Sequence, residues 1–227
     1  DGLDNDCDGV ADNMDRLFEK VDMVFAIDIS GSMLVYIEAI GVGIAEYVLS
    51  LQGTGHKFGI VFFGGDTAPS PPRGGPYIGL QLTNIDTFID TIRGLATSGS
   101  EEPSFDVVHD IANPLNPLGL SWRPDATPIV VLVGDEAPQS QRGLIVEDLE
   151  GFTDSCNLPG CSSLTNPNWR DGDPLELFVF SAPGFIGVWQ QVCSGPEQRV
   201  FNIQRVLDEE LLAIDLALLF QDICVDP

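Results

Sequence analysis

A carboxylate and two hydroxyls stand at alternate positions early in the chain, in Asp28-Ile29-Ser30-Gly31-Ser32. They directly follow residues 21–27, a run rich in Val, Ile and Phe that predicts a buried strand. The carboxyl end of such a strand is where open α/β sheets bind their ligands. Because carboxylate and hydroxyl oxygens are hard donors, the stretch predicts a site for Mg²⁺, Mn²⁺ or Ca²⁺.

Composition limits the classes of function. The chain has 227 residues, 44% of them hydrophobic, which predicts one packed α/β domain with short additions and excludes disorder. Thirty-five acidic residues against ten basic ones give a net charge of −25, which excludes nucleic acid as a partner. Many of the acidic residues are bunched, which favours binding of divalent cations. No apolar run reaches the roughly 18 residues of a membrane span, so no membrane insertion is expected.

The elements that must position these residues alternate between strand and helix patterns. Strands are predicted at residues 21–27, 56–63, 77–82, 128–134, 175–181 and 199–203, and helices at 34–51, 84–95, from 103, 144–156, 188–193 and 207–223. The alternation predicts a doubly wound, mostly parallel central sheet with helices on both faces. Residues 77–82 are expected to form one antiparallel edge strand.

The Asp-x-Ser-x-Ser pattern resembles the metal-ion-dependent adhesion site of von Willebrand factor type A domains, and the resemblance covers about residues 18–224. It implies a Rossmann-like fold in which three loops at one sheet edge hold a divalent cation. Asp28, Ser30 and Ser32 match the first loop. Asp135, in Gly134-Asp135-Glu136 after a Val-rich strand, matches the third loop.

The second loop matches two patterns. Integrin beta subunits, which resemble this chain here, carry a Glu three residues before a Phe-Asp pair, and Glu102 fits that register. Many type A domains use a hydroxyl instead, which Thr97 or Ser104 could supply. Integrin beta domains also carry acidic residues just after the second Ser. Here residues 33–35 are Met-Leu-Val, so no adjacent cation site is expected.

Residues 1–17 form an acidic segment ahead of the domain at 18–227. Its carboxylates stand at alternate positions before a Gly, which matches a calcium-binding loop. The ligands in that register are Asp4, Asp6, Asp8, the backbone oxygen of Val10, Asp12 and Asp15. The segment resembles dockerin loops, thrombospondin type 3 repeats and short metal-binding motifs of exported bacterial proteins, which implies bound Ca²⁺. A solvated acidic linker is the alternative.

Five cysteines without a Cys-x-x-Cys pair favour disulfides in an exported protein over a zinc site. Cys7 and Cys224 lie near opposite termini, which are often close together in compact domains, so we expect them to pair. One further bridge and one odd thiol remain among Cys156, Cys161 and Cys193. The cysteines at 156 and 161 belong to an expected insertion around residues 154–174.

These features predict a secreted or cell-surface recognition module. A cation, with Mg²⁺ expected, would bridge the module to an Asp or Glu of a protein ligand, and loops 64–79, 97–103 and 136–143 would give specificity. The alternative is a structural subunit of a fibre, sheath or surface layer, in which self-assembly occurs and metals only stabilise the fold. No enzymatic activity is expected, because no nucleophile or general base is placed beside an activated water.

Overall fold

The computed structural model describes residues 20–65, 74–113, 115–149, 176–192 and 200–207. Its strands are β1 (Val21–Asp28), β2 (Lys57–Phe63), β3 (Tyr77–Thr83), β4 (Thr127–Val133), β5 (Glu176–Ser181) and β6 (Val200–Asn202). Its helices are η1 (Gly31–Val35), α1 (Ile37–Ser50), α2 (Ile85–Ile92), α3 (Ser104–Ala112), α4 (Val146–Leu149), α5 (Ile186–Val192) and η3 (Ile203–Leu207).

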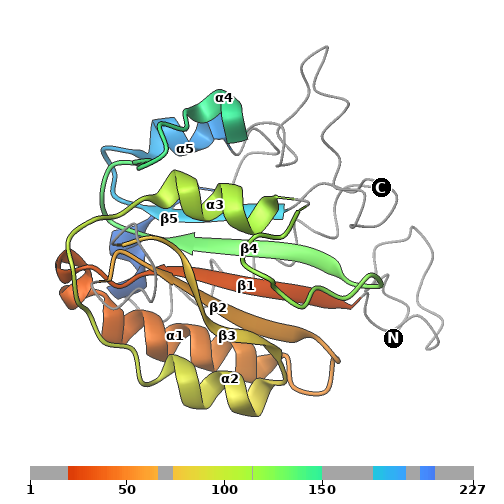
Figure 1. The fold of residues 1–227 in the computed structure, drawn as a ribbon. Coiled ribbons are helices and arrows are strands. Elements are labelled where there is room, and N and C mark those ends of the chain that lie inside the picture. The colour runs from red at the N-terminus through yellow and green to blue at the C-terminus, as the bar shows by residue number, and fades with distance from the viewer. Residues whose placement is uncertain (1–19, 66–73, 114, 150–175, 193–199, 208–227) are drawn as a thin grey trace, which may run out of the picture.

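The strands form one sheet in the order β3-β2-β1-β4-β5-β6, with β1 and β4 at its centre (Figure 1). All neighbouring pairs are parallel except β2 and β3, so β3 is an antiparallel edge strand. The predicted mostly parallel sheet with one antiparallel edge is therefore confirmed. Among the described residues, no helix is long and apolar enough to cross a membrane.

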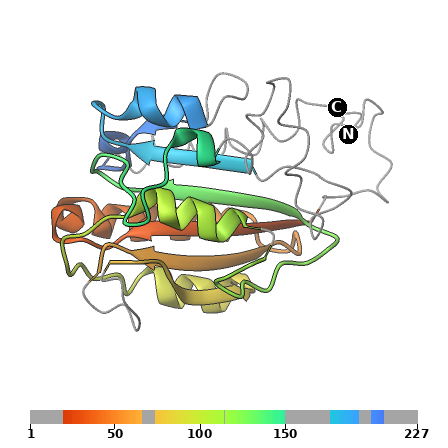
Figure 2. The same ribbon diagram turned by 45° about the horizontal axis from the view of Figure 1, so that its top comes forward.

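Alternating side chains of β1 build two separate hydrophobic cores. Met23, Phe25 and Ile27 pack with residues of α1 and α2 on one face. Val24 and Ala26 pack on the other face with residues of α3, α4 and α5. Figure 2 shows α3 lying across the front of the sheet while α2 lies behind its lower edge. A strand that is buried on both faces must be apolar at nearly every position, as β1 is.

The start of the first helix differs from the prediction. The sequence predicts a helix over residues 34–51, whereas the chain forms the 3₁₀ turn η1 and begins α1 only at Ile37. Met33 is fully buried, and its carbonyl accepts a hydrogen bond from the Tyr36 N–H (2.9 Å). This tighter turn leaves Leu34 and Val35 on the surface, with 68% and 67% of their area exposed.

The other predicted strands and helices that fall within the described residues are present, with small shifts at their ends. α2 ends at Ile92 rather than at residue 95, and its predicted cap is confirmed, because the Asn84 side chain accepts a hydrogen bond from the Thr87 N–H. Several predictions lie outside the described residues: the calcium segment 1–17, the Cys7–Cys224 pair and the other cysteines, the insertion at 154–174, and the closing helix.

The amino end of β1 is held by a buried ion pair. The Arg123 side chain donates to Asp22 Oδ1 through Nε (2.7 Å), and the Arg123 backbone N–H donates to Asp22 Oδ2 (2.6 Å). The same guanidinium reaches the carbonyls of Gly55 and Val21, each at 3.0 Å. Beside it, His56 Nδ1 accepts a hydrogen bond from the Val21 N–H (3.1 Å). These contacts fasten two loops to the first strand at the sheet edge opposite Asp28.

His56 should make the fold sensitive to acid. Burial, together with the charge of Arg123, lowers the pKa of His56 from 6.5 to about 4. Because the unfolded chain takes up the proton first, stability is present above about pH 6.5 and is lost as the pH falls towards 4, by up to about 3 kcal/mol. Urea unfolding of wild type and His56→Gln should therefore show a difference that shrinks with acidification. His109→Gln, which removes the other histidine, is the matched control. Equal pH dependence in wild type and His56→Gln would contradict this role.

Candidate metal centre

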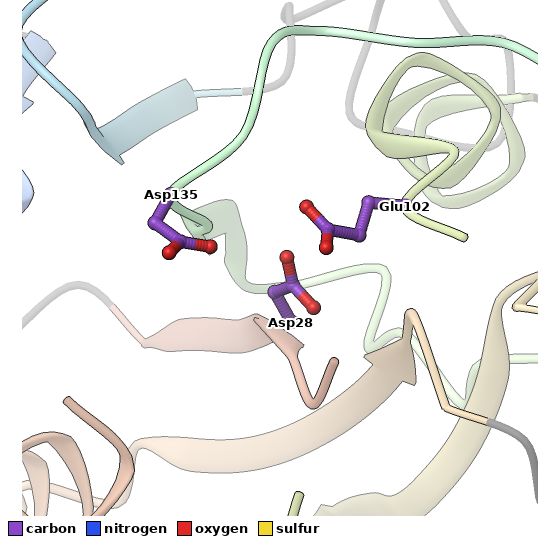
Figure 3. Close-up of side chains that lie close together, drawn as sticks. All are labelled: Asp28, Glu102 and Asp135. Atoms are coloured by element: carbon purple, nitrogen blue, oxygen red, sulfur yellow. The ribbon is translucent and has the colours of Figure 1, made fainter. Parts of the chain in front are cut away.

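Three carboxylates from distant parts of the chain meet at the carboxyl edge of the sheet. Asp28 is the last residue of β1, Glu102 precedes α3, and Asp135 follows the end of β4 at Val133 (Figure 3). One carboxylate oxygen from each lies within 4.8 Å of the others. Figure 3 shows the three side chains converging on one small space. This arrangement could hold a single cation.

The topology of the sheet creates this space. The chain leaves β1 for α1 on one face of the sheet and leaves β4 for α4 on the other face. The two neighbouring central strands therefore send their connections in opposite directions, which opens a crevice between their carboxyl ends. Asp28 and Asp135 lie on either side of that crevice.

Two hydroxyls link the carboxylates. The Oγ atoms of Ser30 and Ser32 are 2.8 Å apart, and Ser32 Oγ donates to Asp135 Oδ1 at 2.9 Å. A longer contact of 3.3 Å joins Ser32 Oγ to Glu102 Oε1. A hydroxyl has one proton, so Ser32 cannot donate fully to both carboxylates. The cluster therefore has more acceptor oxygens than donors.

Two of those acceptors are buried and have no donor. Asp28 and Glu102 are 1% and 5% exposed, and within the described part of the chain no N–H or O–H donates to Asp28 Oδ2 or Glu102 Oε2. The other oxygen of Asp28 accepts from the Ser30 N–H at 2.7 Å. A buried carboxylate without a partner is costly, so this space favours a species that carries positive charge.

The pKa values reflect the same conflict. Burial and the neighbouring Glu102 charge raise the pKa of the Asp28 carboxyl to about 8. Burial is also the main cause that raises the pKa of Glu102, and the charges of Glu136 and Asp135 raise it further. Either a proton or a cation can relieve the repulsion between these groups. The donor set of carboxylates and hydroxyls fits a hard divalent cation.

Glycines keep the space around Asp28 open. Gly64, at the end of β2, has φ +79°, and a Cβ there would lie 2.4 Å from Asp28 Oδ1. Any side chain at this position would therefore collide with the carboxylate in addition to straining the backbone. A cavity of about 10 Å³, lined by Asp28, Glu102, Gly134 and Glu136 among others, remains beside the carboxylates. Its size suits one water-sized species.

The structure brings together all five residues predicted for this site. Glu102 lies in the cluster, whereas among the described residues no hydrogen bond connects Thr97 or Ser104 to the carboxylates. Ser104 Oγ instead accepts from the Gln139 N–H at 3.4 Å, although Ser104 also lines the small cavity. The geometry therefore favours the carboxylate pattern of the second loop over the hydroxyl pattern.

Two features of the site were not predicted from the sequence. Glu136 lines the cavity. Its position directly after Asp135 in the sequence Gly-Asp-Glu could have identified it as part of the site. Asp106 in α3 accepts hydrogen bonds from the Ser140 hydroxyl and from the Gln141 N–H (3.0 Å), and it pairs with Arg142 Nε at 3.3 Å. This contact fastens the loop that carries Asp135 to the helix that follows Glu102.

Mutation should separate the roles of the carboxylates. Asp28→Ala should abolish Mg²⁺ and Mn²⁺ binding, because Asp28 lies at the centre of the cluster. Glu102→Ala should weaken binding by roughly tenfold, since two carboxylates and two hydroxyls remain. Thr97→Ala and Ser104→Ala should have little effect. Titration calorimetry of variants with intact folds measures this. A silent Glu102→Ala together with a damaging Thr97→Ala or Ser104→Ala would assign the second loop to the hydroxyl pattern.

Cation affinity should rise with pH. Because the pKa of Asp28 is raised to about 8, its carboxyl holds a proton below that pH, and a cation must displace it. Mg²⁺ affinity should therefore increase about tenfold per pH unit between about pH 6 and 8, then level off. Calorimetry in two buffers of different ionisation enthalpy would count the released proton. An affinity that is constant over this range would rule out the competition.

Comparison with known proteins supports the fold alone. Neither protein-family models nor curated protein sequences match the chain. Two structures of proximal thread matrix protein 1 from the mussel byssus are similar to this chain, with TM-scores of 0.60 and 0.58 at 17% and 16% identity. The matches cover 90% and 87% of this chain but 48% and 46% of those chains, so the chain spans about half their length. The architecture is thus that of a von Willebrand factor type A-like α/β fold.

Proposed function

We propose that this domain recognises a protein ligand through a divalent cation held by Asp28, Ser30, Ser32, Glu102 and Asp135. The observation that carries the proposal is the pair of buried carboxylate oxygens without donors, on Asp28 and Glu102. Mg²⁺ is the expected ion, because it favours oxygen ligands and retains coordinated water that a ligand can replace; Mn²⁺ or Ca²⁺ would suit the same donors. A bound cation would supply the positive charge that attracts an Asp or Glu of the partner.

The accessible side of the cluster supports recognition. Asp28 and Glu102 are buried, whereas Asp135 is partly exposed and Ser32 is exposed, so the cluster opens to solvent on the side of these two residues. His56, the buried histidine, lies at the opposite edge of the sheet beside Arg123. The described groups that surround the cluster are carboxylates, hydroxyls and apolar side chains. We therefore propose a binding role and no enzymatic activity.

The proposed location is outside the cell. The structurally similar protein comes from the mussel byssus, which is consistent with an extracellular role. The expected calcium segment at 1–17 and the five cysteines also support this location. Weak calcium loops need the high calcium concentration found outside cells, and disulfides form in an oxidising environment.

A second candidate is a structural role in a matrix or fibre. The name of the similar protein, a thread matrix protein, favours it, and the net charge of −25 would let divalent cations bridge neighbouring copies. In this case the cation centre would only stiffen the fold. Electron microscopy of wild type and Asp28→Ala in calcium would separate the two roles, since ordered polymers in both samples favour the structural one.

Recognition through the cation predicts a specific pattern of binding. Wild type should bind at least one member of a panel of immobilised extracellular-matrix proteins in Mg²⁺, and EDTA should remove that binding. Asp28→Ala should bind at least tenfold more weakly in Mg²⁺, because the central carboxylate is missing. Asp86→Ala, which removes an exposed carboxylate from the first turn of α2, is the matched control and should bind as wild type does. Equal binding by wild type and Asp28→Ala with and without EDTA would refute a metal bridge.

A further inference from the structure

Two exposed apolar side chains follow directly on the candidate metal centre. Leu34 and Val35 are 68% and 67% exposed, and they lie in the same 3₁₀ turn as Ser32. The buried member of the turn, Met33, anchors it in the core. The turn therefore holds two large apolar groups in water next to a polar cluster, an arrangement that costs solubility and suits a contact surface.

Leu34 also lines a groove. The groove has a volume of about 560 Å³ and lies between the start of α1 and the end of α2, which run side by side in Figure 1. Its lining is mixed: Leu34, Ile37, Val42, Ile92 and Leu95 supply apolar side chains, Gly41 supplies backbone, and Glu38 and Arg93 supply charged groups. Its volume is in the range that receives side chains or small ligands.

The walls of the groove are rigid. A Cβ at Gly41 would lie 2.8 Å from the carbonyl oxygen of Ile92, so α1 and α2 approach as closely as their backbones allow. The segment that follows α2 is bonded to the first loop of the metal centre. Gly31 N–H donates to the Gly99 carbonyl (3.0 Å), and Ser98 N–H donates to the Ile29 carbonyl (2.6 Å). Groove and metal centre thus share one connected framework.

Arg93 brings positive charge to this surface. Arg123 forms an ion pair with Asp22, and Arg142 forms one with Asp106. Within the described part of the chain, Arg93 forms no ion pair. On a chain with a net charge of −25, an acidic partner is repelled almost everywhere else. A guanidinium beside the groove that pairs with no carboxylate of the described residues favours a partner segment that carries acidic residues.

We propose that the groove between α1 and α2 is a second subsite for the same partner, and that it binds an apolar side chain of a segment whose Asp or Glu reaches the metal centre. This inference rests on the proposed function. Ser32 and Leu34 are two residues apart, so their Cα atoms are separated by at most about 7.6 Å. An extended segment advances about 3.3 Å per residue. An apolar side chain that contacts Leu34 therefore lies about two positions from the acidic residue, and one that contacts the groove beyond Leu34 lies about one or two positions further along.

Selection from a displayed library of random heptapeptides tests the spacing. Wild type is immobilised in Mg²⁺, and bound peptides are eluted with EDTA. The eluted peptides should carry Asp or Glu with Leu, Ile, Phe or Met two to four positions away. Selection on Leu34→Ser should retain the acidic residue and lose the apolar preference. Leu115→Ser, which removes a leucine that is 87% exposed and does not line the groove, should behave as wild type.

Synthetic peptides from the wild-type selection give the second measurement. They should bind Leu34→Ser at least tenfold more weakly than wild type, and Arg93→Ala should weaken them more at low than at high salt. Acidic peptides without an apolar preference, or with one unchanged in Leu34→Ser, would overturn the inference and leave the proposed function standing. Absence of any EDTA-eluted acidic peptide would overturn both. Self-association that Leu34→Ser abolishes, without peptide preference, would assign the groove to a second copy and also overturn the inference.

Discussion

The fold places two carboxyl groups face to face in the interior, and the arrangement around them follows from that constraint. Asp28 and Glu102 are nearly inaccessible, and each keeps one oxygen without a donor among the described residues. Desolvation raises the pKa of both carboxyls, the charge of Glu102 raises that of Asp28 further, and the charges of Glu136 and Asp135 raise that of Glu102. A sequence under selection for stability alone would replace such a pair with apolar residues. Its presence at the crevice between the two central strands therefore favours a binding role over a structural one.

The two edges of the sheet are built for different purposes. At the amino end of β1, Arg123 donates to both oxygens of Asp22 and to two backbone carbonyls, so the buried Asp22 carboxylate is fully paired. At the carboxyl end, the carboxylates outnumber the hydroxyl donors. The two apolar cores between these edges keep them apart and fix the register of β1 against β4. A satisfied ion pair therefore lies at one edge, and the candidate metal centre lies at the other.

Most of the fold and the central residues of the site can be predicted from the sequence, because both depend on local patterns. The apolar runs of β1 and β4 identify buried parallel strands, and Asp28 and Asp135 stand where those strands end. Contacts between distant residues leave no such pattern. The hydrogen bond from Ser140 to Asp106 joins residues 34 positions apart. The 3₁₀ turn depends on the burial of Met33, which becomes visible only when the core is assembled. Helical periodicity therefore placed the start of α1 too early.

Gly64 has a consequence for tracing the ancestry of this chain. The backbone of Gly64 is left-handed, and a Cβ at this position would lie 2.4 Å from Asp28 Oδ1. The residue type tolerated at position 64 therefore depends on the carboxylate at position 28. Two positions that constrain each other sterically should change together during divergence. A homologue that retains the acidic group would keep glycine at the aligned position. Loss of the carboxylate would remove the closest steric barrier to a side chain there, and the left-handed backbone and the contact with Ser30 would still disfavour one. This pairing is a marker of descent that can outlast overall sequence similarity.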